Sequence, residues 1–165
     1  MQIRNAVIAA LLALLPLALL GAQSATATLN LEGQVSEVLT ITVNATNNTG
    51  LNLDDAVTDY KVGEITWTTN NEAGYTVTVS SNNANGTFRF AGTETGNNDT
   101  LDYTLSVGGT DYAPSSGSAQ IADTTSPTGE SGVGPQDIEI SYDGTTTFLN
   151  DGTYEDTLTF SITAK

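Results

Sequence analysis

Residues 28–43, TLNLEGQVSEVLTITV, alternate between two kinds of side chain over their whole length. The odd positions are mostly apolar, and the even positions are polar or charged except for Val38. A period of two is typical of a β-strand with one buried face, because successive strand side chains point to opposite sides of the sheet. The segment therefore predicts a strand near the start of the folded chain. Such a strand can be the domain's own first strand or can be lent to a neighbouring copy, and the residues leave both readings open.

The segment that precedes this strand has the order of features of a secretory signal peptide. A short charged region with Arg4 is followed by an apolar run over residues 6–20 and then by small residues. The run is shorter than the ~20 residues that span a bilayer, which favours a signal over a retained anchor. Cleavage after Ser24 and cleavage after Ala27 both fit the small residues. We predict a signal peptide over residues 1–27 and one secreted domain over residues 28–165.

The charge balance excludes two classes of partner. The chain has 19 acidic and 4 basic residues, which gives a formal net charge of −15. Such an acidic protein repels the phosphates of nucleic acids and of anionic lipids, so we expect neither as a partner.

The absence of two residue types restricts the chemistry. The chain has no cysteine, so no disulfide holds the fold and packing must do so alone. It has no histidine either, which removes the usual nucleophile–base pairs and the thiolate and imidazole metal sites. No pair of carboxylates stands out as the acid and the base that a glycosidase requires at a set separation in a cleft. We therefore predict that the protein is not an enzyme and has no cofactor.

The rest of the chain consists of strand-length alternations that are separated by clusters of turn residues. This pattern predicts an all-β fold, an immunoglobulin-like β-sandwich of seven to eight antiparallel strands. Trp67, the only tryptophan, is expected near the centre of the core. Residues 114–136 contain three of the four prolines and few apolar residues, and they are predicted to form a long loop. After the opening segment, the expected strands are residues 62–69, 75–81, 87–91, 100–107, 110–113, 137–142 and 154–164.

Calcium is the one metal for which the residue types offer ligands. The carboxylates of Asp54, Asp55, Asp99 and Asp151 are hard oxygen donors, and Ca²⁺ takes six to eight of these. No stretch matches the spaced pattern of the helical calcium loop, and aspartate is also an ordinary turn residue. We therefore predict no metal site and keep these four residues as the calcium candidates.

The C-terminal residues resemble a known family. DGTYEDTLTFSITAK (151–165) is similar to the G-x-Y-x-D-T-ϕ-x-ϕ-x-ϕ ending, with ϕ apolar, of the spore coat protein U-like subunits, which are pilins of the chaperone–usher type. GYTVTVSS (74–81) resembles a tyrosine-bearing strand of that family, and FRFAG with NDTLDYTL (88–105) resembles its arginine-bearing strand followed by L-x-Y-x-L. The chain departs from the family in having no cysteine and in residues 114–136, which have no obvious counterpart there.

The resemblance implies an incomplete sandwich that lacks its last strand and is completed by the N-terminal extension of the next subunit. It implies a secreted structural subunit of a surface fibre or pilus that passes through the periplasm to the cell surface, as fimbrial subunits in cell adhesion do. The implied partners are copies of the chain itself, a periplasmic chaperone and an outer-membrane usher, with no membrane insertion after signal cleavage.

Specific residues can be assigned to these implied roles. Residues 28–36 are the possible donor strand, and the side chains expected to fill the groove belong to Leu29, Leu31, Gly33 and Val35. The acceptor groove and core are expected to be formed by Trp67, Tyr154, Leu158, Phe160 and Ile162. The chain stops at Lys165, directly after the last expected strand, so we expect no C-terminal segment to complete the sheet.

Glu37, the one charge on the apolar row, marks an expected hinge at residues 36–38. Residues 29–35 are the part that can pair elsewhere, and residues 39–43 are expected to stay in the sandwich. The alternative is a monomeric secreted β-sandwich, an adhesin or glycan-binding module that uses residues 114–136. That alternative requires the N-terminal strand to pair within its own chain.

Overall fold

The computed structural model describes residues 25–125, 131–144 and 149–165. Most of the predicted signal peptide, through residue 24, lies outside this range. Residues 25–34 contain neither strand nor helix, and residues 35–165 form one compact unit. The described residues contain ten strands: β1 (Leu39–Ala45), β2 (Val57–Thr69), β3 (Gly74–Ser81), β4 (Phe88–Gly92), β5 (Thr100–Val107), β6 (Thr110–Tyr112), β7 (Ser118–Thr125), β8 (Ser131–Tyr142), β9 (Tyr154–Glu155) and β10 (Leu158–Ala164).

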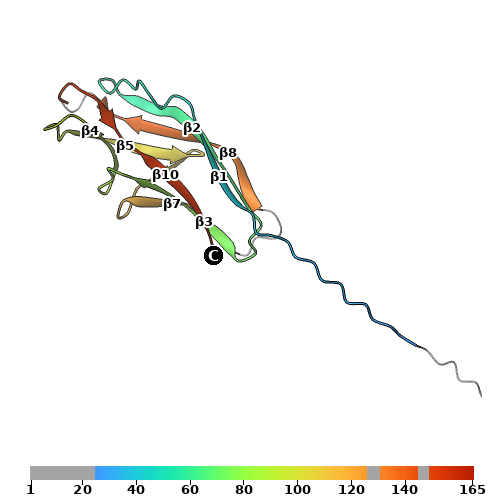
Figure 1. Cartoon of the computed structure of the whole chain (residues 1–165). Helices are drawn as coiled ribbons and strands as arrows, with labels where there is room; N and C mark the ends of the chain where they lie inside the picture. Colours follow the sequence, from blue (N-terminus) through green and yellow to red (C-terminus); the bar gives the residue numbers. More distant parts are fainter. Residues whose placement is uncertain (1–24, 126–130, 145–148) are drawn as a thin grey trace, which may run out of the picture. The chain divides into compact units, whose positions relative to one another are not determined.

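The strands form two antiparallel sheets, which confirms the predicted all-β sandwich (Figure 1). The larger sheet has the order β1-β2-β8-β5-β4-β9, with β6 paired to β5. The smaller sheet has the order β10-β3-β7. β1 and β10 therefore lie at the edges of different sheets.

The core follows from the alternation of side chains along the strands. In β3, Tyr75, Val77 and Val79 are buried, whereas Thr76 and Thr78 are partly exposed. The two sheets pack these apolar faces against one another, as expected for a sandwich. The largest side chains that are fully buried are those of Phe88, Ile65, Leu105, Val77, Val79 and Thr69.

Trp67 lies in this core, as predicted. Its side chain is 4% exposed, and its Nε1 donates a hydrogen bond to the Tyr75 hydroxyl at 3.2 Å. This bond joins β2 of the larger sheet to β3 of the smaller sheet and satisfies the only polar atom of the indole.

The predicted opening strand is shorter than the alternation suggested. β1 begins at Leu39 and pairs with β2 in a register that places Ile41 opposite Trp67. Residues 39–43 thus belong to the sandwich, as predicted, and the strand starts directly after the expected hinge. Residues 25–38 form no strand.

The prediction that residues 114–136 form a long loop is wrong. This range contains β7 and the first half of β8, which pairs with β2 so that Val133 lies opposite Trp67. Pro135 is tolerated in β8 because the β2–β8 register shifts between Ile65 and Trp67, and an irregular position does not require a ladder N–H from every residue. In β7, only Ala119 is buried, so the strand has little apolar pattern for sequence reasoning to detect.

The prediction of one continuous strand over residues 154–164 is also wrong. β9 pairs with β4 in the larger sheet, and β10 pairs with β3 in the smaller sheet, so the chain changes sheets between them. Asp156 lies at this crossing and accepts hydrogen bonds from the Tyr103 hydroxyl (2.6 Å), the Ser81 hydroxyl (2.8 Å) and the Thr157 backbone N–H (2.8 Å). Its carboxylate therefore fixes the crossing to both sheets.

The Tyr103–Asp156 bond makes stability depend on pH at the alkaline end. Burial and the Asp156 carboxylate both raise the pKa of Tyr103 above its ordinary value. A raised pKa means that the folded state resists ionisation, so the stabilisation is complete below pH ~10 and declines as the pH rises further. We expect the midpoint temperature of thermal unfolding to decrease as the pH rises from roughly 10 to 12, the range in which tyrosine ionises. The decrease should be smaller in Tyr103→Phe.

Circular dichroism melting across this pH range measures the effect. Tyr112→Phe is the matched control, because it removes a hydroxyl that donates to the neutral carbonyl of Ile121 at 3.1 Å. An equally steep alkaline loss in Tyr103→Phe and in the parent protein would contradict the assignment.

Candidate functional site

One side of the sandwich is bordered by two strands with free edges. β1 pairs with β2 alone and β10 pairs with β3 alone, and no other described strand bonds to their outer edges. β1 and β10 nevertheless lie close to each other in space. Their outer edges present unpaired backbone N–H and C=O groups, which can pair with an added strand. We call this side of the domain the open side.

β10 carries an apolar row on the open side. Leu158, Phe160 and Ile162 are half-buried and pack against the core, and they alternate with exposed Thr159 and Ser161. In a complete sandwich, the inner face of a strand is covered by the facing sheet and by both neighbours. These three residues therefore lie together on β10 and are only partly covered.

Tyr154, the fourth predicted groove residue, lies elsewhere. It belongs to β9 in the larger sheet, and its hydroxyl donates to the Asn150 carbonyl at 2.8 Å and accepts from Asn97 Nδ2 at 3.1 Å. The break at Asp156 separates it from the row on β10.

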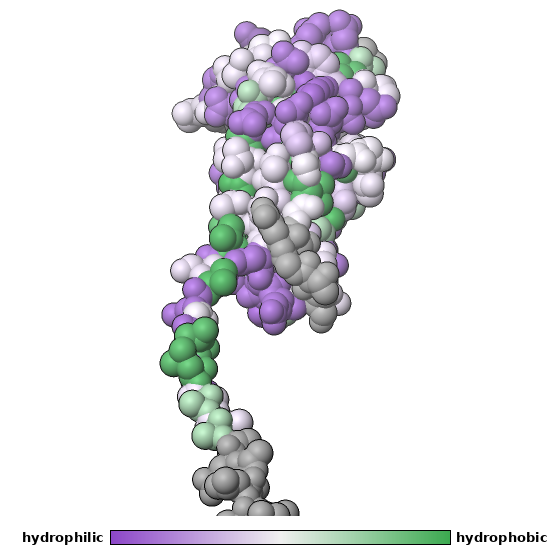
Figure 2. Space-filling view, turned by 90° about the vertical axis from the view of Figure 1, so that its right-hand side faces the viewer, coloured by the Kyte–Doolittle hydropathy of each residue, from purple (hydrophilic) through white to green (hydrophobic). Residues whose placement is uncertain are grey.

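β1 contributes a second apolar row that the sequence reasoning did not assign to the groove. Ile41 packs against the core, whereas Leu39 and Val43 remain 37% and 44% exposed. The signal was present in the sequence, since these residues continue the odd-numbered apolar row of residues 28–43. Figure 2 shows separate apolar patches on the face turned toward the viewer, whereas the upper end of the domain is predominantly hydrophilic.

The predicted donor residues lie outside any strand. Leu29, Leu31 and Val35 are 81%, 88% and 85% exposed, which is unusual for large apolar side chains. A Cβ added at Gly33 would meet nothing within 4 Å. When the segment is extended, these four residues share one face because strand side chains repeat every two residues.

Residues 36–38 are held by the hairpin between β2 and β3. The Asn70 backbone N–H donates to the Val38 carbonyl at 3.2 Å, and the Val38 N–H donates to Asn70 Oδ1 at 2.6 Å. Asn70 Nδ2 donates to the Ser36 carbonyl at 2.9 Å, and Asn71 Nδ2 donates to Glu37 Oε1 at 2.7 Å. Because Leu39 already pairs with Thr69, these bonds extend the β1–β2 ladder beyond the end of β1.

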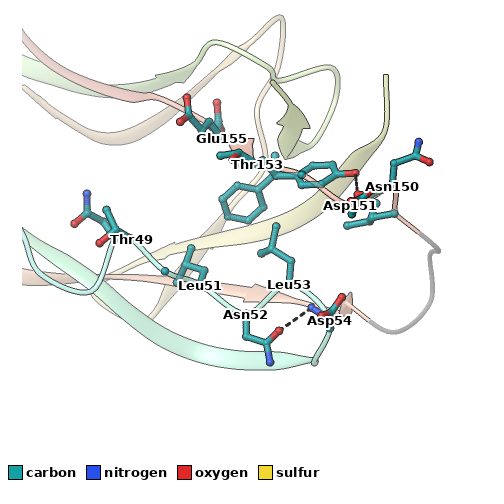
Figure 3. Close-up of a pocket in the computed structure, with 16 residues that line it drawn as sticks. Thr49, Leu51, Asn52, Leu53, Asp54, Asn150, Asp151, Thr153 and Glu155 are labelled. Atoms are coloured by element: carbon teal, nitrogen blue, oxygen red, sulfur yellow. Dashed lines mark hydrogen bonds between the residues drawn. The ribbon is translucent and has the colours of Figure 1, made fainter. Parts of the chain in front are cut away.

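A separate pocket of about 820 Å³ lies between residues 48–54 and residues 149–156. Leu51 and Leu53 project from the first segment toward the second (Figure 3), and Phe90 and Leu149 also line the space. The polar lining includes several carboxylates and asparagines. The pocket thus combines an apolar wall with an acidic rim.

The structure distributes the four calcium candidates over different contacts. Asp54 and Asp151 line the pocket, Asp55 accepts a hydrogen bond from Asn52 Nδ2 at 2.7 Å, and Asp99 accepts two from Asn150. Within the described ranges, no three acidic side chains are grouped in a way that would hold a metal ion.

The basic side chains of the sandwich are engaged by its own carboxylates. Lys61 Nζ lies 2.7 Å from Asp137 and 2.6 Å from Glu64, and these two hydrogen bonds raise the pKa of Lys61. Arg89 lies 3.6 Å from Asp102, and Lys165 pairs with Asp123. Among the acidic side chains, a hydrogen bond from the Thr153 backbone lowers the pKa of Glu94.

Comparison with known proteins finds similarity among solved structures alone. No family model and no curated protein matches the chain. Among solved structures, the chain is similar to the crystal structure of the E. coli Hda pilus minor tip subunit, HdaB. The identity is 17% and the TM-score is 0.38, and the match covers 74% of this chain and 79% of that chain. Among the described residues, no helix is both long and apolar enough to span a bilayer.

The partial cover of the open side leads to a stability prediction. Phe88 is 1% exposed, whereas Phe160 is half-buried on β10, the edge strand of the smaller sheet. We expect Phe88→Ala to lower the free energy of unfolding by ~3–5 kcal/mol and Phe160→Ala to lower it by about half as much, because a partly exposed ring loses less on truncation. Urea unfolding at low protein concentration compares the two, and equal losses would show that the open side is as well packed as the core.

Proposed function

We propose that the protein is a structural subunit that assembles with copies of itself by strand addition. In this proposal, residues 29–35 of one copy lie along the open side of the next copy, between β1 and β10. The observation that carries the proposal is that two free edges with half-covered apolar rows lie close together. The exposed apolar side chains of residues 29–35 are the complement of this surface.

An added strand supplies the two things that the open side lacks, which are backbone partners for its edges and cover for its apolar rows. Its backbone can pair with the free N–H and C=O groups of the edges, in the manner of strand addition. Its alternate side chains can fill the space over Phe160 and Ile41 and remove apolar surface from water. Burial of a leucine or valine side chain contributes ~1.5–3 kcal/mol, so Leu29, Leu31 and Val35 together supply a substantial driving force.

The same reasoning suggests the setting in which the subunit works. A chain that is exported, as the predicted secretory signal indicates, and that has exposed apolar edges needs its open side covered in transit, because free edges invite aggregation. We therefore propose export through the periplasm with a chaperone on the open side, delivery by an outer-membrane usher and a final location in a fibre at the cell surface. The role is structural, since the chain has none of the histidine or cysteine that most nucleophilic catalysis uses.

A second candidate function is suggested by the pocket next to Leu51 and Leu53. Its apolar wall and acidic rim could bind a small ligand in a monomeric secreted binding module. This candidate differs from the first in its oligomeric state, because it requires no contact between copies.

Assembly is tested with two neighbouring substitutions in the donor segment. Leu31→Asp places a charge on the apolar face, and a charge is expelled from an apolar groove, so we expect the association to weaken by about 100-fold or more. Asn30→Asp is the matched control, since residue 30 points to the opposite face of an extended strand. Light scattering after size exclusion and electron microscopy of the exported chain measure the assemblies.

Deletion of residues 28–34 is expected to give chains that do not assemble with one another but can still accept a donor strand. Assembly of Leu31→Asp at the level of Asn30→Asp would refute strand addition by this segment. A parent chain that remains monomeric at all concentrations would instead favour the binding module.

A further inference from the structure

The position of Asn70 affects whether residues 29–35 insert into their own copy or into another copy. Residues 29–35 are covalently attached to the domain whose open side they could fill, so insertion into the same copy competes with insertion into another. Proximity favours the same copy, because a tethered strand has a high effective concentration. Something in the chain must oppose this if fibres are to form.

Self-insertion requires a reversal of the chain directly before β1. To reach the free edge of β1, residues 29–35 must run antiparallel to β1 and form a hairpin with it. Side chains that lie opposite each other in an antiparallel pair point to the same face. Leu31 and Val35 therefore face the groove only if they lie opposite odd-numbered residues of β1, such as Val43 and Leu39.

This parity restricts the length of the turn. A two-residue turn, at residues 36–37, would place Gln34 opposite Leu39. Every apolar donor side chain would then point away from the groove, because a shift of one residue reverses the faces. The shortest suitable turn has three residues, which are residues 36–38 when Val35 lies opposite Leu39. These are the same three residues that the β2–β3 hairpin holds.

The hydrogen bonds of this hairpin are incompatible with such a turn. Asn70 engages both backbone groups of Val38 and the carbonyl of Ser36, on the β2 side of β1. Asn71 engages the side chain of Glu37 between them. Residues 36–38 are thereby held as a continuation of β1, whereas self-insertion needs them to fold back toward its opposite edge.

We infer that Asn70, together with the Asn71–Glu37 bond, forms a clamp that blocks self-insertion and reserves residues 29–35 for a second copy. The inference rests on the proposed function and adds a regulation of the same site. The clamp therefore disfavours completion of the sandwich by the copy's own residues 29–35 and favours completion by the same residues of another copy.

The clamp is tested by its removal in the full chain as it is exported. Asn70→Ala combined with Glu37→Ala removes the side-chain bonds and leaves Asn71 in its turn, where its Oδ1 accepts from the Ala73 N–H. The matched control combines Asn98→Ala with Glu72→Ala. Asn98 Nδ2 donates to the Gly96 carbonyl at 3.5 Å within its own turn, and Glu72 is an exposed residue of the β2–β3 hairpin.

Two measurements report the choice. Size exclusion with light scattering gives the fraction of chain in assemblies. Mass spectrometry of the monomer fraction detects an intrachain disulfide between Leu31→Cys and Val43→Cys, which lie opposite each other only after self-insertion; the chain has no other cysteine. Loss of these three exposed hydrogen bonds should raise the ratio of self-inserted monomer to assembly by roughly tenfold, whereas the control should leave it unchanged.

A second variant keeps the test decisive if the first one folds poorly. Glu37→Asn with Val38→Gly supplies the residues that a three-residue turn favours and changes no residue of a strand. It is expected to raise the intrachain disulfide in the same direction. If both variants assemble like the parent and form no intrachain disulfide, the clamp is refuted while strand addition stands. If the parent itself forms no assemblies, the proposed function fails first.

Discussion

The carboxylate of Asp156 determines where the chain crosses from the larger sheet to the smaller sheet. It binds Tyr103 from β5 and Ser81 from β3, which belong to different sheets, at the point where β9 ends and β10 begins. Because β10 starts two residues later, its place at the edge of the smaller sheet follows from this anchor. The open side and the separation of Tyr154 from Phe160 are both consequences. A polar contact at one crossing thus decides which apolar residues can form a groove.

Sequence reasoning predicted most of the sandwich for a simple physical reason. In β3 and β5, apolar residues that face the core alternate with polar residues along most of the strand, and a period of two has no other common explanation. The same reasoning located Trp67 in the core and the boundary between residues 29–35 and β1. It also identified Leu158, Phe160 and Ile162 as one row, although it extended that row too far.

The remaining features depend on contacts that a linear pattern does not contain. β7 and the first half of β8 are rich in polar residues and glycine, and they become strands because β3 and β2 offer them partners. The break at Asp156 depends on side chains 53 and 75 residues away in sequence. Asn70 and Asn71 look like ordinary turn residues, and their bonds to residues 36–38 emerge only from the folded hairpin.

The ion pairs within the domain have a consequence for contacts between copies. Lys61, Arg89 and Lys165 each neutralise a carboxylate of their own copy, and the described part of the chain holds no other lysine or arginine. The chain has 19 acidic and 4 basic residues, so a neighbouring copy has few cations to offer its other carboxylates. Two copies of the chain therefore repel each other over the ~8–10 Å that dissolved salt leaves unscreened. In the proposed strand addition, apolar burial and backbone pairing would have to overcome this repulsion, so a higher salt concentration is expected to favour longer assemblies.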